Sequence, residues 1–137
     1  MNRLIIIIIF GLFFVLIKAN AGNESGVENT KISYKDYVKR IEADDTTLDY
    51  FSFRMAYTES KDYDPTNANI DEYVTRMYRD LKDTNFTRAK LMADEILKRN
   101  YAHIGAHLAM AQAQRELGDS GEYLFHKTVA EKIIKSI

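Results

Sequence analysis

A shortage of helix-breaking residues is the feature that most constrains how this chain can fold. The 137 residues contain one proline, Pro65, and six glycines. The stretches between them carry apolar residues at the three-and-four spacing of one helical face, which predicts amphipathic helices. A fold of strands and tight turns would need turn residues more often than this. We therefore expect an all-α fold of about six helices in antiparallel hairpins.

Capping residues and stop signals place the boundaries of these helices. The expected helices cover residues 33–43, 47–59, 69–82, 86–99, 102–117 and 120–137. The residues suited to cap their N-termini are Ser33, Thr47, Asn69, Asn85 and Asp119 or Ser120. Asn100 and Gly118 are suited to end the fourth and fifth helices in a left-handed conformation. In the second helix Phe51 and Met55 lie on one face and Phe53 widens it, which predicts a helix buried on two sides.

The first 21 residues have the layout of a secretory signal peptide. A basic start at Arg3 is followed by the apolar run Leu4–Ile17, and small residues then occupy positions 19 and 21. A helix over that run would span roughly 21 Å, which is less than the hydrocarbon core of about 30 Å. We therefore expect cleavage after Ala21. If the run stayed uncleaved, it would instead tether the domain to the outer side of a membrane.

Composition defines the class of the part that remains after cleavage. Residues 22–31 are polar and predict a flexible mature N-terminus, and residues 32–137 form one helical domain. Removing Arg3 and Lys18 leaves 17 basic and 20 acidic residues, so no basic surface is available for nucleic acid. The chain has no cysteine. An exported protein without disulfides is typical of bacteria, so we expect a periplasmic or secreted protein.

Two turns suggest a weak internal repeat. Thr84-Asn85 and Gly118-Asp119 lie 34 residues apart, which is the period of tetratricopeptide hairpins. The helix bodies align better at an offset of 37 residues, which places His126 opposite Ala89, an apolar core position. The domain therefore resembles tetratricopeptide hairpins without being a standard array.

A second resemblance covers about residues 32–137. The stretch Leu48–Tyr57, followed by Tyr63-Asp64-Pro65, resembles a family of secreted bacterial proteins of unknown function. That family carries an Asp-Phe-x-x-Leu-Arg-x-Ala-Tyr stretch, then Ser-Pro-x-Tyr-x-Pro-Tyr, and later Ala-His and Leu-Gly-Asp elements. Here Ala106-His107 and residues 117–119 match the later elements. Lys61 and Thr66 depart from the family pattern, and a strand-like tail that the family carries after a Lys/Arg-Ser-Ile step is absent. The resemblance implies export and helical hairpins, without an activity.

Three histidines are the candidates for a metal site. His103 and His107 are four residues apart, a spacing that puts both on one face of a helix. Ile104 stands where the zincin pattern has glutamate. The alternative is structural, with His107 packed under the next hairpin and His126 partly buried in a core position.

Arg54 lies within an aromatic and apolar helix face. If it is buried it needs an acidic partner, for which Asp49 and Asp62 are the candidates. The ion pair would attach the second helix to the linker, with Tyr57, Tyr63 and Pro65 packed around it. An anion-binding role for Arg54 is the alternative.

No motif for catalysis is present. The chain has neither a Gly-x-Ser-x-Gly elbow nor a glycine-rich phosphate loop. We therefore expect no enzyme and no cofactor, but an exported helical scaffold that binds a protein or peptide partner through Gln112, Gln114 and Arg115. The alternatives are a metal-binding or hydrolytic secreted protein that uses the three histidines, and a secreted virulence-associated factor.

Overall fold

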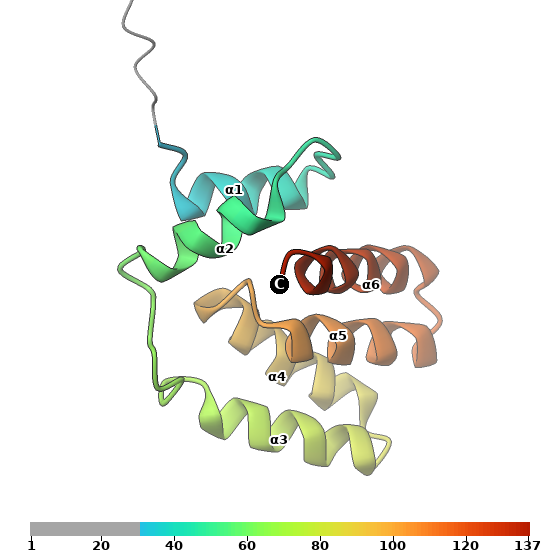
Figure 1. The fold of residues 1–137 in the computed structure, drawn as a ribbon. Coiled ribbons are helices and arrows are strands. Elements are labelled where there is room, and N and C mark those ends of the chain that lie inside the picture. Colours follow the sequence, from blue (N-terminus) through green and yellow to red (C-terminus); the bar gives the residue numbers. More distant parts are fainter. Residues whose placement is uncertain (1–30) are drawn as a thin grey trace, which may run out of the picture. The chain divides into compact units, whose positions relative to one another are not determined.

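The computed structural model describes residues 31–137, which form six helices and no strand (Figure 1). The helices are α1 (Tyr34–Glu42), α2 (Tyr50–Thr58), α3 (Asp71–Lys82), α4 (Phe86–Arg99), α5 (Ile104–Glu116) and α6 (Ser120–Lys135). The all-α prediction is confirmed for these residues. The predicted signal peptide, residues 1–21, and most of the predicted mature N-terminus lie outside the described residues.

Helices α3 to α6 form a unit that we call the stack. Each helix of the stack packs antiparallel against the next one, and α3 also contacts α5 (Figure 1). The buried positions of the stack are rich in alanine, a residue small enough to let helix backbones approach closely. The fully or nearly fully buried alanines are Ala89, Ala93, Ala106, Ala109, Ala111, Ala113 and Ala130.

Helices α1 and α2 form a pair that we call the cap, and α2 also packs against α6. The interior of the cap is aromatic. Phe53 has no exposed surface, and its ring stacks on Tyr34 and meets Tyr37 and Tyr50 at centroid distances of 5.7–6.2 Å. The Tyr34 hydroxyl also accepts a 2.7 Å hydrogen bond from the backbone N–H of Tyr101, after α4. This bond joins the cap to the stack.

Several predicted boundaries are confirmed. Helix α4 covers the predicted residues, and the Asn85 side chain accepts a hydrogen bond from the Arg88 N–H. Ser33 caps α1 and Asp119 caps α6 in the same way. Gly118 has a φ of 85°, as expected for a left-handed helix stop.

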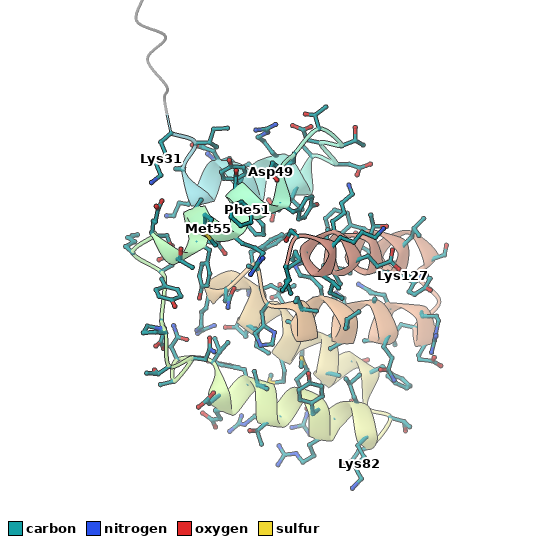
Figure 2. The ribbon with its side chains drawn as sticks, viewed as in Figure 1. Lys31, Asp49, Phe51, Met55, Lys82 and Lys127 are labelled. Carbon is teal, nitrogen blue, oxygen red and sulfur yellow. The ribbon has the colours of Figure 1, made fainter. Side chains whose placement is uncertain are left out.

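The second helix differs from the prediction. Asp49, not Thr47, is its N-cap, and it accepts from the N–H groups of Phe51 and Ser52. Thr47 instead donates its N–H and its hydroxyl to Asp45 within the preceding turn. Phe51 is 54% exposed and, together with Met55, lies on the outer side of α2 (Figure 2). The helix therefore buries one face, since the cap has no third helix to cover the other.

Three further boundaries are corrected. Ile70, not Asn69, is the N-cap of α3, and its apolar side chain cannot accept a capping hydrogen bond; the Asn69 N–H donates to Asp64 in the linker turn. Asn100 has a φ of −141°, so it ends α4 in an extended conformation. Helix α5 begins at Ile104, two residues after the predicted start, since His103 caps it.

The repeat appears in the turns at one offset and in the core at another. Thr84 and Gly118, 34 positions apart, both have positive φ and both precede a capping residue. Buried positions instead match at an offset of 37, where Ala89 corresponds to His126 and Ile96 to Ile133. The first turn of α6 is mostly exposed, so its buried face begins one turn later than that of α4.

Across residues 31–137 every helix is too short or too polar to cross a bilayer.

Candidate functional site

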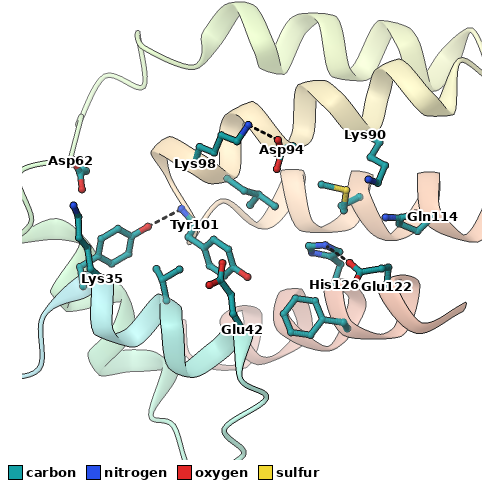
Figure 3. A pocket seen from close by; sticks show the side chains of 15 residues that line it. Lys35, Glu42, Asp62, Lys90, Asp94, Lys98, Tyr101, Gln114, Glu122 and His126 are labelled. Atoms are coloured by element: carbon teal, nitrogen blue, oxygen red, sulfur yellow. Dashed lines mark hydrogen bonds and ion pairs between the residues drawn. The ribbon is translucent and has the colours of Figure 1, made fainter. Parts of the chain in front are cut away.

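A groove with a volume of about 560 Å³ lies between α1 and the stack (Figure 3). This volume is in the usual range for ligand sites, about 300–1,000 Å³. The apolar side chains that line it are Val38 from α1, Leu97 from α4, Met110 from α5 and Phe125 from α6. Because its walls come from α1 and from three helices of the stack, the groove depends on the docking of the cap.

The groove also carries charges of both signs. Its charged lining residues are Lys35, Lys90, Lys98, Glu42, Asp62, Asp94 and Glu122. The four carboxylates outnumber the three lysines, so the groove has one negative charge in excess. Within residues 31–137 neither Lys35 nor Lys90 forms an ion pair.

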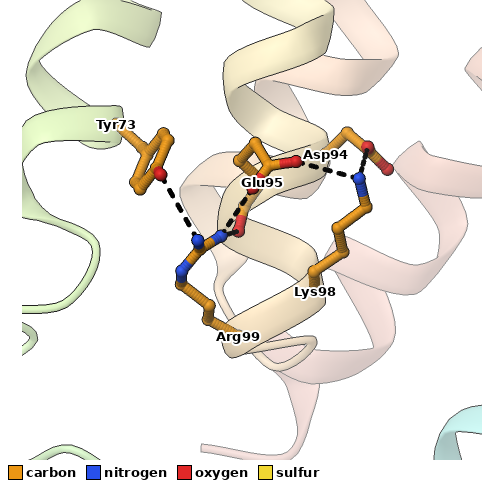
Figure 4. A network of polar contacts seen from close by, with 5 residues as sticks. All are labelled: Tyr73, Asp94, Glu95, Lys98 and Arg99. Atoms are coloured by element: carbon orange, nitrogen blue, oxygen red, sulfur yellow. Dashed lines mark hydrogen bonds and ion pairs between the residues drawn. The ribbon is translucent and has the colours of Figure 1, made fainter.

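Lys98, in contrast, is held in place by a network along α4 (Figure 4). Its ammonium group lies 2.7 Å from Asp94 and 2.9 Å from Glu95. Glu95 also pairs with Arg99 at 2.8 Å, and the Arg99 guanidinium lies 4.6 Å from the ring centre of Tyr73 on α3. Lys98 and Asp94 therefore satisfy each other and contribute little free charge to the groove.

Two histidines meet at the base of the groove. The Nδ1 atoms of His107 on α5 and His126 on α6 are 3.0 Å apart. The Nε2 atom of His107 lies 2.8 Å from the backbone carbonyl oxygen of Tyr101. On the other side, the Nε2 atom of His126 lies 3.5 Å from a carboxylate oxygen of Glu122. The two imidazoles thus form a chain that runs from the backbone to the groove.

The direction of these hydrogen bonds follows from the chemistry of the end groups. A carbonyl oxygen only accepts, so His107 carries a proton on Nε2. One more proton lies between the two Nδ1 atoms. The neutral pair has no further proton, and the Nε2 atom of His126 is then a bare acceptor.

The neutral form of the pair is favoured by burial. His107 has no exposed surface and His126 is 7% exposed. Desolvation lowers the pKa of His107 to about 3. Desolvation, with a further contribution from the charge of Lys90, lowers the pKa of His126 to about 4. At neutral pH the groove therefore presents an uncharged His126 ring beside the Glu122 carboxylate.

The structure separates the three residues predicted to bind a partner. Gln114 is 5% exposed and lines the groove, and its side-chain amide makes no hydrogen bond within residues 31–137. Gln112 and Arg115 are exposed and lie outside the groove lining, and Arg115 pairs with Glu116. Of the three, only Gln114 belongs to the groove.

The three histidines do not share one face of a helix. His103 lies before α5, where its Nδ1 atom accepts the Ala106 N–H at 3.0 Å. His107 and His126 use their Nδ1 atoms for each other. In residues 31–137 no group of three histidines or carboxylates is placed to hold a metal ion.

Arg54 has a different partner from the one predicted. Its guanidinium donates a 2.8 Å hydrogen bond to the backbone carbonyl oxygen of Ser136, and it forms no ion pair within residues 31–137. Asp49 is unavailable because it caps α2. Arg54 thus attaches α2 to the end of α6 rather than to the linker. With Tyr57, Tyr63 and Pro65 it lines a smaller hollow of about 250 Å³.

The groove itself was not predicted from sequence. Glu122 and His126 are four residues apart on one helix, a spacing that could have indicated their contact. No sequence signal indicated that Tyr34, Lys35 and Val38 of α1 would form the opposite wall, because that depends on how the cap docks.

No protein-family model matches the chain, and neither curated proteins nor solved structures give a significant match.

Proposed function

We propose that this protein is an exported helical module that binds a peptide segment of a protein partner in the groove between α1 and the stack. The observation that carries the proposal is the side chain of Gln114, which lines the groove and makes no hydrogen bond within residues 31–137. Its amide is open to the groove, because Asp80 Oδ2 is the one buried side-chain polar atom without a partner in these residues. A peptide backbone offers both the N–H and the C=O that this amide can pair with.

The lining of the groove favours a peptide over a small apolar ligand. Apolar side chains such as Leu97 and Phe125 alternate with charged ones such as Lys35 and Glu42. A peptide, with apolar side chains and a polar backbone, complements both kinds of surface. Packing of consecutive antiparallel helices in α3–α6 also supports the proposed likeness to tetratricopeptide hairpins.

Peptide selection tests this function. The full domain would be panned against a library of random dodecapeptides, and the affinities of enriched peptides measured for two variants on the same helix. Replacing Gln114 by alanine should weaken binding about tenfold, the usual effect of losing one or two hydrogen bonds. Replacing Gln112 by alanine should leave binding unchanged, because Gln112 lies outside the groove. Failure to enrich any peptide, or equal binding by both variants, would count against the proposal.

Export is the second part of the proposal, and its support is the signal-like sequence of residues 1–21. The mass of the full chain after expression in a bacterium tests it. Export predicts a mature protein that begins at Gly22 and is recovered from the periplasm or the medium. A product that retains Met1 in the membrane fraction would indicate the anchored alternative.

A further inference from the structure

The polar end of the groove holds two hydrogen-bond acceptors side by side. In the neutral histidine pair, the Nε2 atom of His126 is bare, and it lies 3.5 Å from Oε2 of Glu122. The His126 ring is more than nine-tenths buried and lines the groove. Within residues 31–137 no donor is placed between the two atoms (Figure 3). The position calls for a group that donates to both.

The surrounding charges favour a cation. Glu122 on α6 faces this end, Asp94 on α4 is neutralised by Lys98, and the groove as a whole has one negative charge in excess. Lys90 on α4 is the one nearby positive charge, and it forms no ion pair within residues 31–137. From α5, His107 and Gln114 contribute neutral polar groups.

We propose that a guanidinium group, the side chain of an arginine in the bound peptide, occupies this position and donates one N–H to His126 Nε2 and another to Glu122. A guanidinium edge carries two parallel N–H groups in a rigid fork, whereas the N–H groups of an ammonium diverge. Two neighbouring acceptors therefore suit arginine better than lysine. The apolar stem of the arginine would lie against Phe125 and Met110, which line the same groove. This inference rests on the proposed peptide-binding function.

A proton on the histidine pair is the main competing occupant, because it would turn His126 Nε2 into a donor toward Glu122. Burial opposes that proton, and so does the charge of Lys90, since both lower the pKa of His126. The ¹⁵N chemical shifts of the histidine rings decide the point. We expect at pH 7 one unprotonated nitrogen at His126 Nε2 and a protonated Nε2 on His107. A spectrum in which Nε2 is protonated on both His107 and His126 would overturn the inference.

Binding of three small probes tests the preference for a guanidinium. The probes are the amides of Nα-acetyl-arginine, Nα-acetyl-lysine and Nα-acetyl-citrulline, of which the last is uncharged and nearly the same shape as arginine. We expect the arginine amide to shift the His126 Nε2 signal saturably. The citrulline amide should bind at least about tenfold more weakly than the arginine amide, since hydrogen bonds from a charged donor are roughly twice as strong as those from a neutral one. Equal affinities for arginine and citrulline amides would overturn the inference.

Three substitutions locate the site. Glu122 is half-exposed and leaves the core intact when changed, so E122Q should fold and should weaken arginine amide binding about tenfold. Glu131, on the same helix and outside the groove, supplies the control E131Q, which should bind as the parent does. K90Q should strengthen binding severalfold, because it removes a like charge near the site. If Lys90 were itself the missing donor, K90Q would leave binding unimproved; that result, or equal binding by E122Q and E131Q, would overturn the inference.

The outcomes separate this inference from the proposed function. Selected peptides that depend on Gln114 but lack arginine would overturn the inference and leave the function standing. An arginine amide that binds through Glu122, with no peptide enriched from the library, would leave the guanidinium site standing and count against the peptide function.

Discussion

The cap and the stack differ in the size of their buried side chains, which are mainly aromatic rings in the cap and include many alanines in the stack. The cap has two helices of nine residues each, and its interior is filled by the rings of Tyr34, Tyr37, Tyr50, Phe53 and Tyr57. The stack has longer helices, and alanine occupies seven of their seventeen buried positions. Short helices have few buried positions, so each one must bury a large area. We conclude that stability is concentrated in single residues in the cap and spread over many in the stack.

The largest expected effect is in the cap. Phe53→Ala removes the ring at its centre and should lower the free energy of unfolding by about 3–5 kcal/mol. Phe51→Ala, two positions earlier and exposed, is the matched control and should change it by less than about 0.5 kcal/mol. Urea denaturation of both variants measures the difference. Similar losses for the two would show that the cap is not organised around Phe53.

Acid should act on the stack. The pKa values of His107 and His126 are lowered in the folded state. The contribution of these two histidines to the free energy of unfolding is therefore complete above the unfolded pKa of 6.5 and is lost as the pH falls toward about 4. Protons taken up by the unfolded chain cause the loss. Lowering the pH from 7 to 5 should reduce the free energy of unfolding by about 4 kcal/mol, which is about 2 kcal/mol for each histidine. Urea titrations at several pH values measure the slope, and Phe53→Ala should show the same slope because the cap contains neither histidine. A flat profile would contradict the neutral histidine pair.

The bond that joins the two regions gives a smaller effect. Tyr34→Phe removes the hydroxyl that accepts the Tyr101 N–H and leaves that buried donor unpaired, which should cost about 1–3 kcal/mol. Tyr37→Phe is the control, because within residues 31–137 its hydroxyl makes no hydrogen bond. Hydrogen exchange at the Tyr101 amide reports the change directly. Unaltered protection in Tyr34→Phe would mean that the cap docks without this bond.

The smallest effects belong to the two equivalent turns of the stack. Thr84 has a φ of 56° although it is β-branched, so Thr84→Gly should raise the free energy of unfolding by about 1 kcal/mol. Gly118→Ala should lower it by about 1 kcal/mol through the backbone alone, because an added Cβ would meet nothing within 4 Å. Thermal melts of both single variants measure these shifts. If Thr84→Gly and Gly118→Ala shifted the melting temperature in the same direction, the two turns would not be equivalent.

The sequence predicted the stack better than the cap. In the stack, local signals agree with one another: Asn85 and Asp119 cap helices, Gly118 ends one, and the apolar spacing matches the buried face. In the cap, Asp49 competes with Thr47 for the capping position, and Phe51 and Phe53 are equally apolar in sequence. Which ring is buried depends on how α1 packs on α2, since Phe53 meets Tyr34 and Tyr37 of α1, and this is not encoded locally. Of the predicted binding residues, Gln114 lines the groove and Gln112 and Arg115 do not, since a helix turns its faces by about 100° per residue.

The hydrogen bond between Tyr34 and Tyr101 spans 67 positions of the chain. Helices α3 to α6, in contrast, contact mainly their sequence neighbours across short connections. Closing a long loop costs more entropy than closing a short one, and contacts between distant residues form slowly. The stack should therefore assemble first and the cap should dock onto it afterwards. The groove forms only at that last step. A ligand that contacts both of its walls would therefore stabilise the docked cap and slow the dissociation of the cap from the stack.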